Sequence, residues 1–152
     1  MIRLPVQIDI GFSDIITPES VAIVYPAILG HPAPEFPAYN RETVIAEKFE
    51  ATVKLGELNS RMKDFSIFES WQGLDNFAAR SFRRPMEQTF SQRGTALVAD
   101  PICFTEAFAM NSAKVARWAV FLRRNRSASF PKWNSSAALP RRHVRWGEEI
   151  QR

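Results

Sequence analysis

The hydrophobic and polar positions of this chain change their spacing along its length. In the segment VQIDI the apolar side chains alternate with polar ones, which predicts a half-buried strand over residues 5–10. A short apolar run over residues 21–25 predicts a second strand. The prolines spread over residues 26–37 predict a connector that is neither regular sheet nor helix. From Tyr39 onward the apolar spacing becomes helical, so the pattern predicts strands first and helices after.

Capping residues set the bounds of the first two predicted helices. Asn40 is a good N-cap and Gly56 a good helix stop, which predicts one helix between them. A second helix is predicted at about residues 60–72, capped by Asn59 or Ser60. Its inward stripe is expected to consist of Leu58, Arg61, Phe65 and Phe68.

Two further helical regions follow. Asp75 is a candidate cap for a third helix, which Pro85 is expected to break or restart before Gly94. Pro101 opens a last helical region, which we expect to split near Asn111. The apolar set of that region is typical of a helix bundle and consists of Phe104, Phe108, Val115, Trp118, Phe121 and Leu122.

One lysine of the first predicted helix lies where an apolar residue is expected. At about 100° per residue, one face carries Val44, Ile45, Phe49 and Thr52, and the opposite face carries Glu47, Glu50 and Lys54. Lys48 falls within the apolar sector, where a charge is costly unless an anion meets it. We expect its ammonium group to approach Asp64 or Asp9, in a site that could also meet an anionic ligand. The alternative is a lysine that reaches solvent from the edge of the face.

The composition bounds the class of protein. With 152 residues and 45% hydrophobic content, the chain is long enough for one globular domain with a substantial core. No apolar run approaches the roughly 20 residues that span a bilayer, and the N-terminus lacks the layout of a signal peptide. We therefore expect a cytoplasmic protein without a membrane partner.

Few side chains are suited to metal binding or nucleophilic catalysis. The single cysteine, Cys103, excludes an internal disulfide and a multi-cysteine zinc site, and the only histidines are His31 and His143. Cys103 lies between Ile102 and Phe104, which favours a buried small hydrophobic residue over a nucleophile. The sequence holds neither a G-x-x-x-x-G-K phosphate loop nor a G-x-S-x-G elbow.

The positive charge of the chain is concentrated in its last thirty residues. Residues 123–152 hold eight Lys and Arg against two Glu, a net charge of +6, whereas the rest of the chain carries −2. This tail has no sustained hydrophobic period, which is typical of a disordered segment or of unrelated, out-of-frame sequence. Alternatively, it binds RNA through its arginines, with Trp133 and Trp146 stacking on bases.

Four segments of the chain resemble one known family. VQIDIGFSDIITP, YPAILGHPAPEFPAYNRETVIAEKFEATVKLGELNSRMKDF, MEQTFSQRGT and WAVFLRR are similar to the second half of the nucleotidyl transferase AbiEii/AbiGii toxin family, over residues 2–124. The resemblance implies an α/β protein in which a nucleotidyltransferase sheet precedes a mainly helical, bundle-like region. It also implies the toxin role in phage-defence toxin–antitoxin systems, with a cognate antitoxin as partner. The implied reaction is magnesium-dependent transfer of a nucleotide from a nucleoside triphosphate to an acceptor that in some members is tRNA.

The resemblance assigns roles to individual residues. The family's E-K pair matches Glu47 and Lys48, and the lysine is expected to meet the triphosphate. Arg61, Lys63 and Asp64 match the start of the later R-x-K-D motif. We therefore expect Lys48 and Asp64 to be catalytic, and Lys48, Arg61 and Lys63 to bind the nucleotide.

The metal site implied by the resemblance is incomplete in this sequence. Asp9 is a candidate Mg²⁺ ligand because a strand would hold it rigidly, although a solvent-facing Asp on an edge strand fits equally well. Ile67 stands where the family pattern has a second aspartate, and the family's first motif, a D-x-D strand, would lie upstream of Met1. Two-metal phosphoryl transfer needs converging carboxylates, so we expect a truncated, inactive form. The alternative function is a non-enzymatic module that binds an antitoxin or RNA.

These interpretations divide the chain into three parts. Residues 1–38 are expected to be a strand-containing remnant of the nucleotidyltransferase domain. Residues 39–124 form the helical region, and residues 125–152 form the basic tail, predicted to be disordered.

Overall fold

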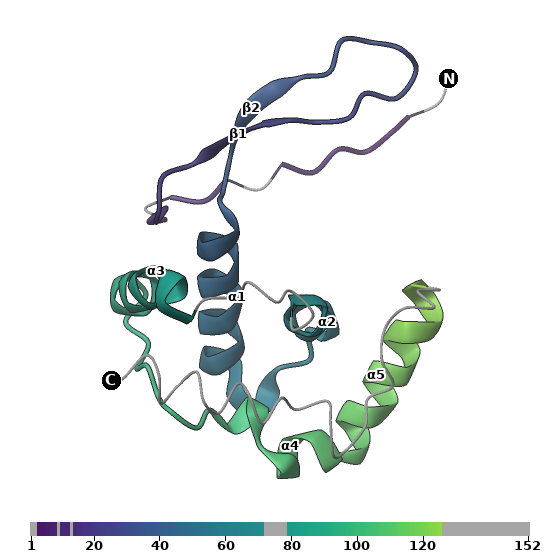
Figure 1. Cartoon of the computed structure of the whole chain (residues 1–152). Coiled ribbons are helices and arrows are strands. Elements are labelled where there is room, and N and C mark those ends of the chain that lie inside the picture. Colours follow the sequence, from purple (N-terminus) through teal and green to yellow (C-terminus); the bar gives the residue numbers. More distant parts are fainter. Residues whose placement is uncertain (1–2, 9, 13, 72–78, 126–152) are drawn as a thin grey trace.

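A computed structural model describes residues 3–8, 10–12, 14–71 and 79–125 of the chain. It confirms the α/β class, since a small antiparallel sheet precedes the helices. Figure 1 shows the helices gathered around α1, with the β1–β2 hairpin at the N-terminal end of that helix. The elements are β1 (Val21–Val24), β2 (Glu35–Ala38), α1 (Arg41–Leu55), η1 (Gly56–Leu58), α2 (Met62–Trp71), α3 (Ala79–Gln92), η2 (Ile102–Phe104), α4 (Glu106–Met110) and α5 (Ser112–Asn125).

The β1–β2 hairpin forms from the second predicted strand and the end of the predicted connector. Val21 pairs with Ala38, so the prediction of a strand at residues 21–25 is confirmed. Pro37 lies within β2 and pairs with Ala22, so the prediction of an irregular connector through residue 37 is wrong at its end. Proline is tolerated there because both strands of a two-stranded sheet are edge strands.

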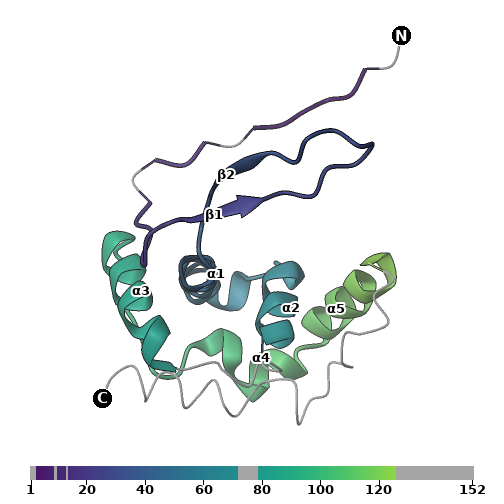
Figure 2. The same ribbon diagram turned by 45° about the horizontal axis from the view of Figure 1, so that its top comes forward.

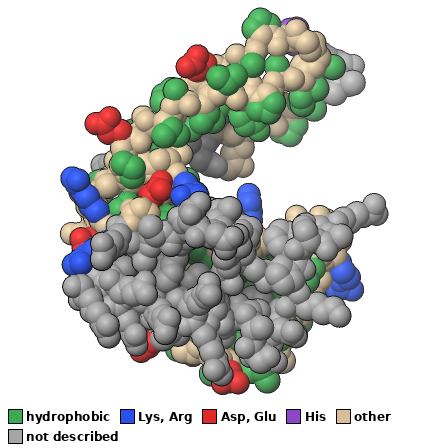
Figure 3. All heavy atoms as spheres, in the orientation of Figure 1, with side chains coloured by type: hydrophobic (Ala, Val, Ile, Leu, Met, Phe, Trp, Pro, Cys, Tyr) green, Lys and Arg blue, Asp and Glu red, His purple; other side chains and the backbone are tan. Residues whose placement is uncertain are grey.

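The strand predicted over residues 5–10 is not formed in the described part of that segment. Residues 5–8 and residue 10 have no regular structure, and Val6, Ile8 and Ile10 are exposed. Alternation makes a half-buried strand only where a partner strand and a covering layer exist, and the described sheet consists of β1 and β2 alone. Figure 3 shows that hydrophobic side chains also gather on the surface of the hairpin.

α1 is the central helix, and it begins and ends as its capping residues predict. The side chain of Asn40 accepts a hydrogen bond from the Thr43 N–H at 2.7 Å. Gly56, with a φ of 49°, ends the helix in a conformation that favours glycine. Figure 2, which looks nearly along α1, shows α3 on one side of it and α2 on the other, with α5 beyond α2.

Two clusters of buried side chains hold the helices together. The first joins α1, α2 and α3 and consists of Ile45, Ala46, Phe49, Phe68, Phe82, Met86 and Phe90. The second joins α2, η2, α4 and α5 and consists of Met62, Phe65, Cys103, Phe108 and Trp118. Phe104 packs against both clusters, so the helical region has one nearly continuous core.

The predicted inward stripe of α2 is correct for Phe65 and Phe68, which are buried. It is wrong for Leu58 and Arg61, which are exposed. The reason is that Leu58 lies in η1, outside α2, and that Arg61 lies just before Met62, the first residue of α2.

The later helices follow the predicted order with one correction. Pro85 lies inside α3, so the expected break there is wrong; Asp75, its predicted cap, lies outside the described residues. Asn111 ends α4, and its side chain accepts the N–H groups of Ala113 and Lys114 at the start of α5, which confirms the predicted split. Cys103 is buried as predicted, and burial raises the pKa of its thiol to about 12.

Candidate functional site

The candidate site is an arrangement of two cations around one carboxylate, where α1 meets the start of α2. Lys48 Nζ lies 3.1 Å from Asp64 Oδ1, and Arg61 Nε lies 2.9 Å from Asp64 Oδ2. The approach of Lys48 to Asp64 is therefore as predicted. We call these three residues the K-R-D triad.

Local structure at the start of α2 explains how the triad is positioned. The side chain of Asn59 accepts a hydrogen bond from the Arg61 N–H at 2.9 Å, which fixes the backbone before the helix. Arg61 and Asp64 are three residues apart, so their side chains meet on one face of the helical turn. The turn itself is held by Lys114 of α5, whose ammonium donates to the backbone carbonyls of Glu57, at 2.6 Å, and of Asn59.

Lys114 is itself buried, and its surroundings determine how it holds this turn. Its ammonium lies 4.6 Å from the centroid of the Phe108 ring, a cation–π contact. Burial lowers the pKa of Lys114, and the nearby Arg117 lowers it further. The two carbonyl contacts and the ring thus satisfy a cation that few water molecules reach.

The K-R-D triad has a net positive charge, because two cations surround one buried carboxylate. The Asp64 side chain is only 3% exposed, whereas those of Lys48 and Arg61 are 26% and 57% exposed. Both oxygens of Asp64 face a cation, so the carboxylate fixes the position of the two positive groups while leaving them open to solvent. Such an arrangement can bind an anion with several oxygens.

The other two predicted site residues are not part of the triad. The Lys63 side chain is exposed, and none of the ion pairs among the described residues includes it. Asp9, the predicted metal ligand, lies outside the described residues.

The described residues do not fit a magnesium site. None of them form a group of three or more His, Cys, Asp or Glu side chains placed to hold a metal ion. The one carboxylate of the triad, Asp64, accepts from two cations, which is the environment of an anion site rather than of Mg²⁺.

A second charged cluster lies on the side of α1 that faces α3, and the sequence pattern did not reveal it. Arg93 contacts Asp14 at 3.2 Å, Glu47 at 3.3 Å and Glu50 at 3.1 Å, and the Thr95 hydroxyl donates to Glu50. Glu50 is buried although helical spacing places it opposite the apolar face, because α3 covers it.

Burial also shifts the ionisation of Glu47 in this cluster. Desolvation raises the pKa of Glu47, partly opposed by Arg93. A signal for the cluster existed in the sequence, since Arg93 continues the helical spacing of the buried Met86 and Phe90 and would need an acidic partner there.

Comparison with family models decides the identity of the chain. The model described as nucleotidyl transferase AbiEii toxin, type IV TA system, matches residues 1–141. The chain belongs to this family. Comparison with curated proteins and with solved structures gave no match.

Membership in the AbiEii family confirms part of the predicted function. The family consists of toxin–antitoxin nucleotidyltransferases, which implies a nucleotide substrate and an antitoxin partner. The match extends beyond Arg124 to residue 141, so it includes part of the basic tail, for which unrelated sequence was one of the interpretations. Among the described helices, none is long and apolar enough to cross a membrane.

Proposed function

We propose that the K-R-D triad of this AbiEii-family chain binds the triphosphate of a nucleoside triphosphate. The observation that carries the proposal is the pair of partly exposed cations, Lys48 and Arg61, held on opposite oxygens of the buried Asp64. A triphosphate offers several anionic oxygens, which suit the compact Lys ammonium and the planar Arg guanidinium. In this proposal Lys48 and Arg61 contact the phosphates and Asp64 orients both.

The acceptor of the nucleotide is proposed to be RNA, with tRNA as the leading candidate, and the biological role to be phage defence. Support comes from the family resemblance of the motifs that contain Lys48 and Asp64. Lys63 is proposed to reach the phosphates from the exposed side of α2 once the nucleotide is bound.

Magnesium would supply charge neutralisation of the phosphates during transfer in this family of enzymes. We propose that this chain by itself binds a nucleotide without transferring it. Ile67 supplies no carboxylate at the position where the family pattern has its second aspartate, and Asp64 is occupied by two cations. Asp9 remains the proposed metal ligand.

Nucleotide binding is tested by equilibrium dialysis with labelled nucleoside triphosphates. Lys48→Met and Arg61→Met should each weaken binding about tenfold or more, because hydrogen bonds from charged groups are lost. Lys54→Met is the matched control, since Lys54 lies on the same helix, is exposed and takes part in no ion pair among the described residues. Equal affinities of the Lys48 and Lys54 variants, with both folded by circular dichroism, would contradict the proposal.

Turnover is tested separately by incubating the chain with magnesium, each labelled triphosphate and total tRNA. No transfer of label to RNA is expected. If label reaches the RNA at a rate that Lys48→Met abolishes, the chain is an active enzyme and the proposed loss of turnover is wrong.

A further inference from the structure

A pocket of about 420 Å³ lies between the segment that opens α2 and residues 116–125 of α5. Its lining residues are Ser60, Met62, Ala116, Arg117, Val120, Phe121, Arg124 and Asn125. The volume is within the range of sites for small ligands. Ser60 and Met62 flank Arg61 in the sequence, so the pocket adjoins the same turn that carries the K-R-D triad.

Among the described residues, the charged lining of this pocket is positive. Arg117 and Arg124 both line it, and none of the described lining residues is acidic. α5 carries four Lys and Arg and no Asp or Glu, and the ion pairs among the described residues include neither arginine. The pocket is therefore complementary to an anion.

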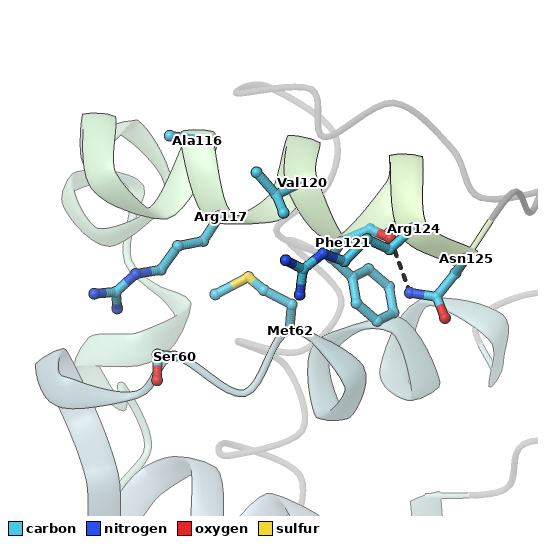
Figure 4. A pocket seen from close by; sticks show the side chains of 8 residues that line it. All are labelled: Ser60, Met62, Ala116, Arg117, Val120, Phe121, Arg124 and Asn125. Carbon is cyan, nitrogen blue, oxygen red and sulfur yellow. Dashed lines mark hydrogen bonds between the residues drawn. The ribbon is translucent and has the colours of Figure 1, made fainter.

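The arrangement of the two arginines favours a ligand with more than one phosphate. Arg117 and Arg124 are seven residues apart, two turns of α5, which separates their backbones by about 10 Å on the same face. In Figure 4 the Met62 side chain lies between the two guanidinium groups. A nucleic-acid strand has a phosphate at every nucleotide and can therefore contact both arginines. A single phosphate can contact both only if the side chains of Arg117 and Arg124 converge on it.

The space between the arginines is apolar and partly aromatic. Met62, Val120 and Phe121 line it, and the Phe121 ring is held in place by stacking on Trp118 at a centroid distance of 5.4 Å. A nucleobase has the flat apolar face that packs on such a surface, and base–aromatic contacts are a common feature of single-strand recognition. Asn125 lies at the rim, where its amide donates to the Phe121 carbonyl at 2.8 Å.

We propose that this pocket binds a short stretch of single-stranded nucleic acid, with phosphates on Arg117 and Arg124 and a base against Phe121 and Met62. The site is separate from the K-R-D triad but shares the turn that carries it. The role of the bound nucleic acid as acceptor of the nucleotide rests on the proposed function. The binding of nucleic acid in the pocket is independent of the proposed function.

The test measures fluorescence anisotropy of a labelled single-stranded RNA octamer with the full chain. Arg117→Ala and Arg124→Ala together should weaken binding about tenfold or more and lower the salt dependence of log K by about one for each arginine. Arg123→Ala is the matched control, because it removes the same charge from the same helix turn at a residue that does not line the pocket. It should change the affinity less than about twofold.

Two further measurements separate base stacking in the pocket from charge attraction, and the pocket from the K-R-D triad. Phe121→Leu keeps an apolar contact with Trp118 but removes the flat ring, so a folded variant should lose affinity for the octamer while keeping affinity for inorganic tripolyphosphate. The double arginine variant should bind nucleoside triphosphate as wild type does, whereas Lys48→Met should keep octamer binding. Failure of the triad and failure of the pocket are thus distinguishable.

Three results would overturn the inference. If Arg123→Ala weakens binding as much as the double arginine variant, the attraction is general to the helix. An unchanged affinity of the double variant would show that the RNA binds elsewhere. Equal loss of tripolyphosphate and octamer binding in Phe121→Leu would show that the ring does not contact a base.

Discussion

Replacing Glu50 by Gln perturbs the ion pair that contains the most deeply buried carboxylate among the described ion pairs. The Glu50 side chain is 2% exposed, one oxygen lies 3.1 Å from Arg93 Nη1, and the other accepts from the Thr95 hydroxyl. Gln keeps the shape and the acceptor for Thr95, but it removes the charge opposite Arg93. The substitution therefore keeps the packing but removes both the charge and the acceptor opposite Arg93, where the amide of Gln places a donor.

The expected magnitude follows from the surroundings of Arg93. Removing one partner of a fully buried ion pair costs about 3–5 kcal/mol. Arg93, however, is 30% exposed and keeps Asp14 at 3.2 Å and Glu47 at 3.3 Å, so its charge remains compensated. The neutral Gln side chain also costs less to bury than the charged Glu50 side chain, which offsets a further part of the lost stability. We expect the free energy of unfolding to fall by about 2 kcal/mol, within the range for a hydrogen bond to a charged group.

Urea denaturation followed by circular dichroism measures this change, and a thermal scan should show a decrease in Tm of about 6 °C. Glu87→Gln is the matched control. Glu87 also pairs with an arginine, Arg83, at 2.9 Å, but its side chain is 48% exposed, so the loss should stay below about 0.5 kcal/mol. Equal stabilities of the two variants would refute the reasoning that burial of Glu50 makes its charge important.

Three other substitutions or treatments test the structure. Cys103, whose pKa burial raises to about 12, should react with a thiol reagent only on unfolding, which a denaturant series of labelling rates measures. Burial raises the pKa of Glu47 from 4.5, so the stability advantage of wild type over Glu47→Gln should fall as pH rises through the folded pKa, as urea titrations at several pH values would show. Lys114→Met should lower the unfolding free energy by about 2 kcal/mol, measured by urea denaturation against Lys54→Met, because two carbonyls lose their donor.

The features that could be predicted from the sequence alone are local ones. Helix ends depend on side chains and backbone within a few residues. The residue types at Asn40, Gly56 and Asn111 were therefore enough to predict where helices begin, end and split. The direction of Lys48 was also predictable, because helical spacing puts it on the face that meets α2. The motif segments identified the family, which the comparison confirmed.

Features that depend on which element covers which face could not be predicted from the sequence. α3 packs against Phe49 of the apolar face of α1 and also covers Glu50, which periodicity places on the opposite face, and this makes Glu50 a buried partner of Arg93. The alternating segment at residues 5–10 lacks a partner strand among the described residues, so its pattern alone does not make it a strand. Hydrophobic spacing predicts which apolar side chains share one face of a helix. Whether a polar side chain is buried depends instead on the neighbouring helix that covers it and supplies its charged partner.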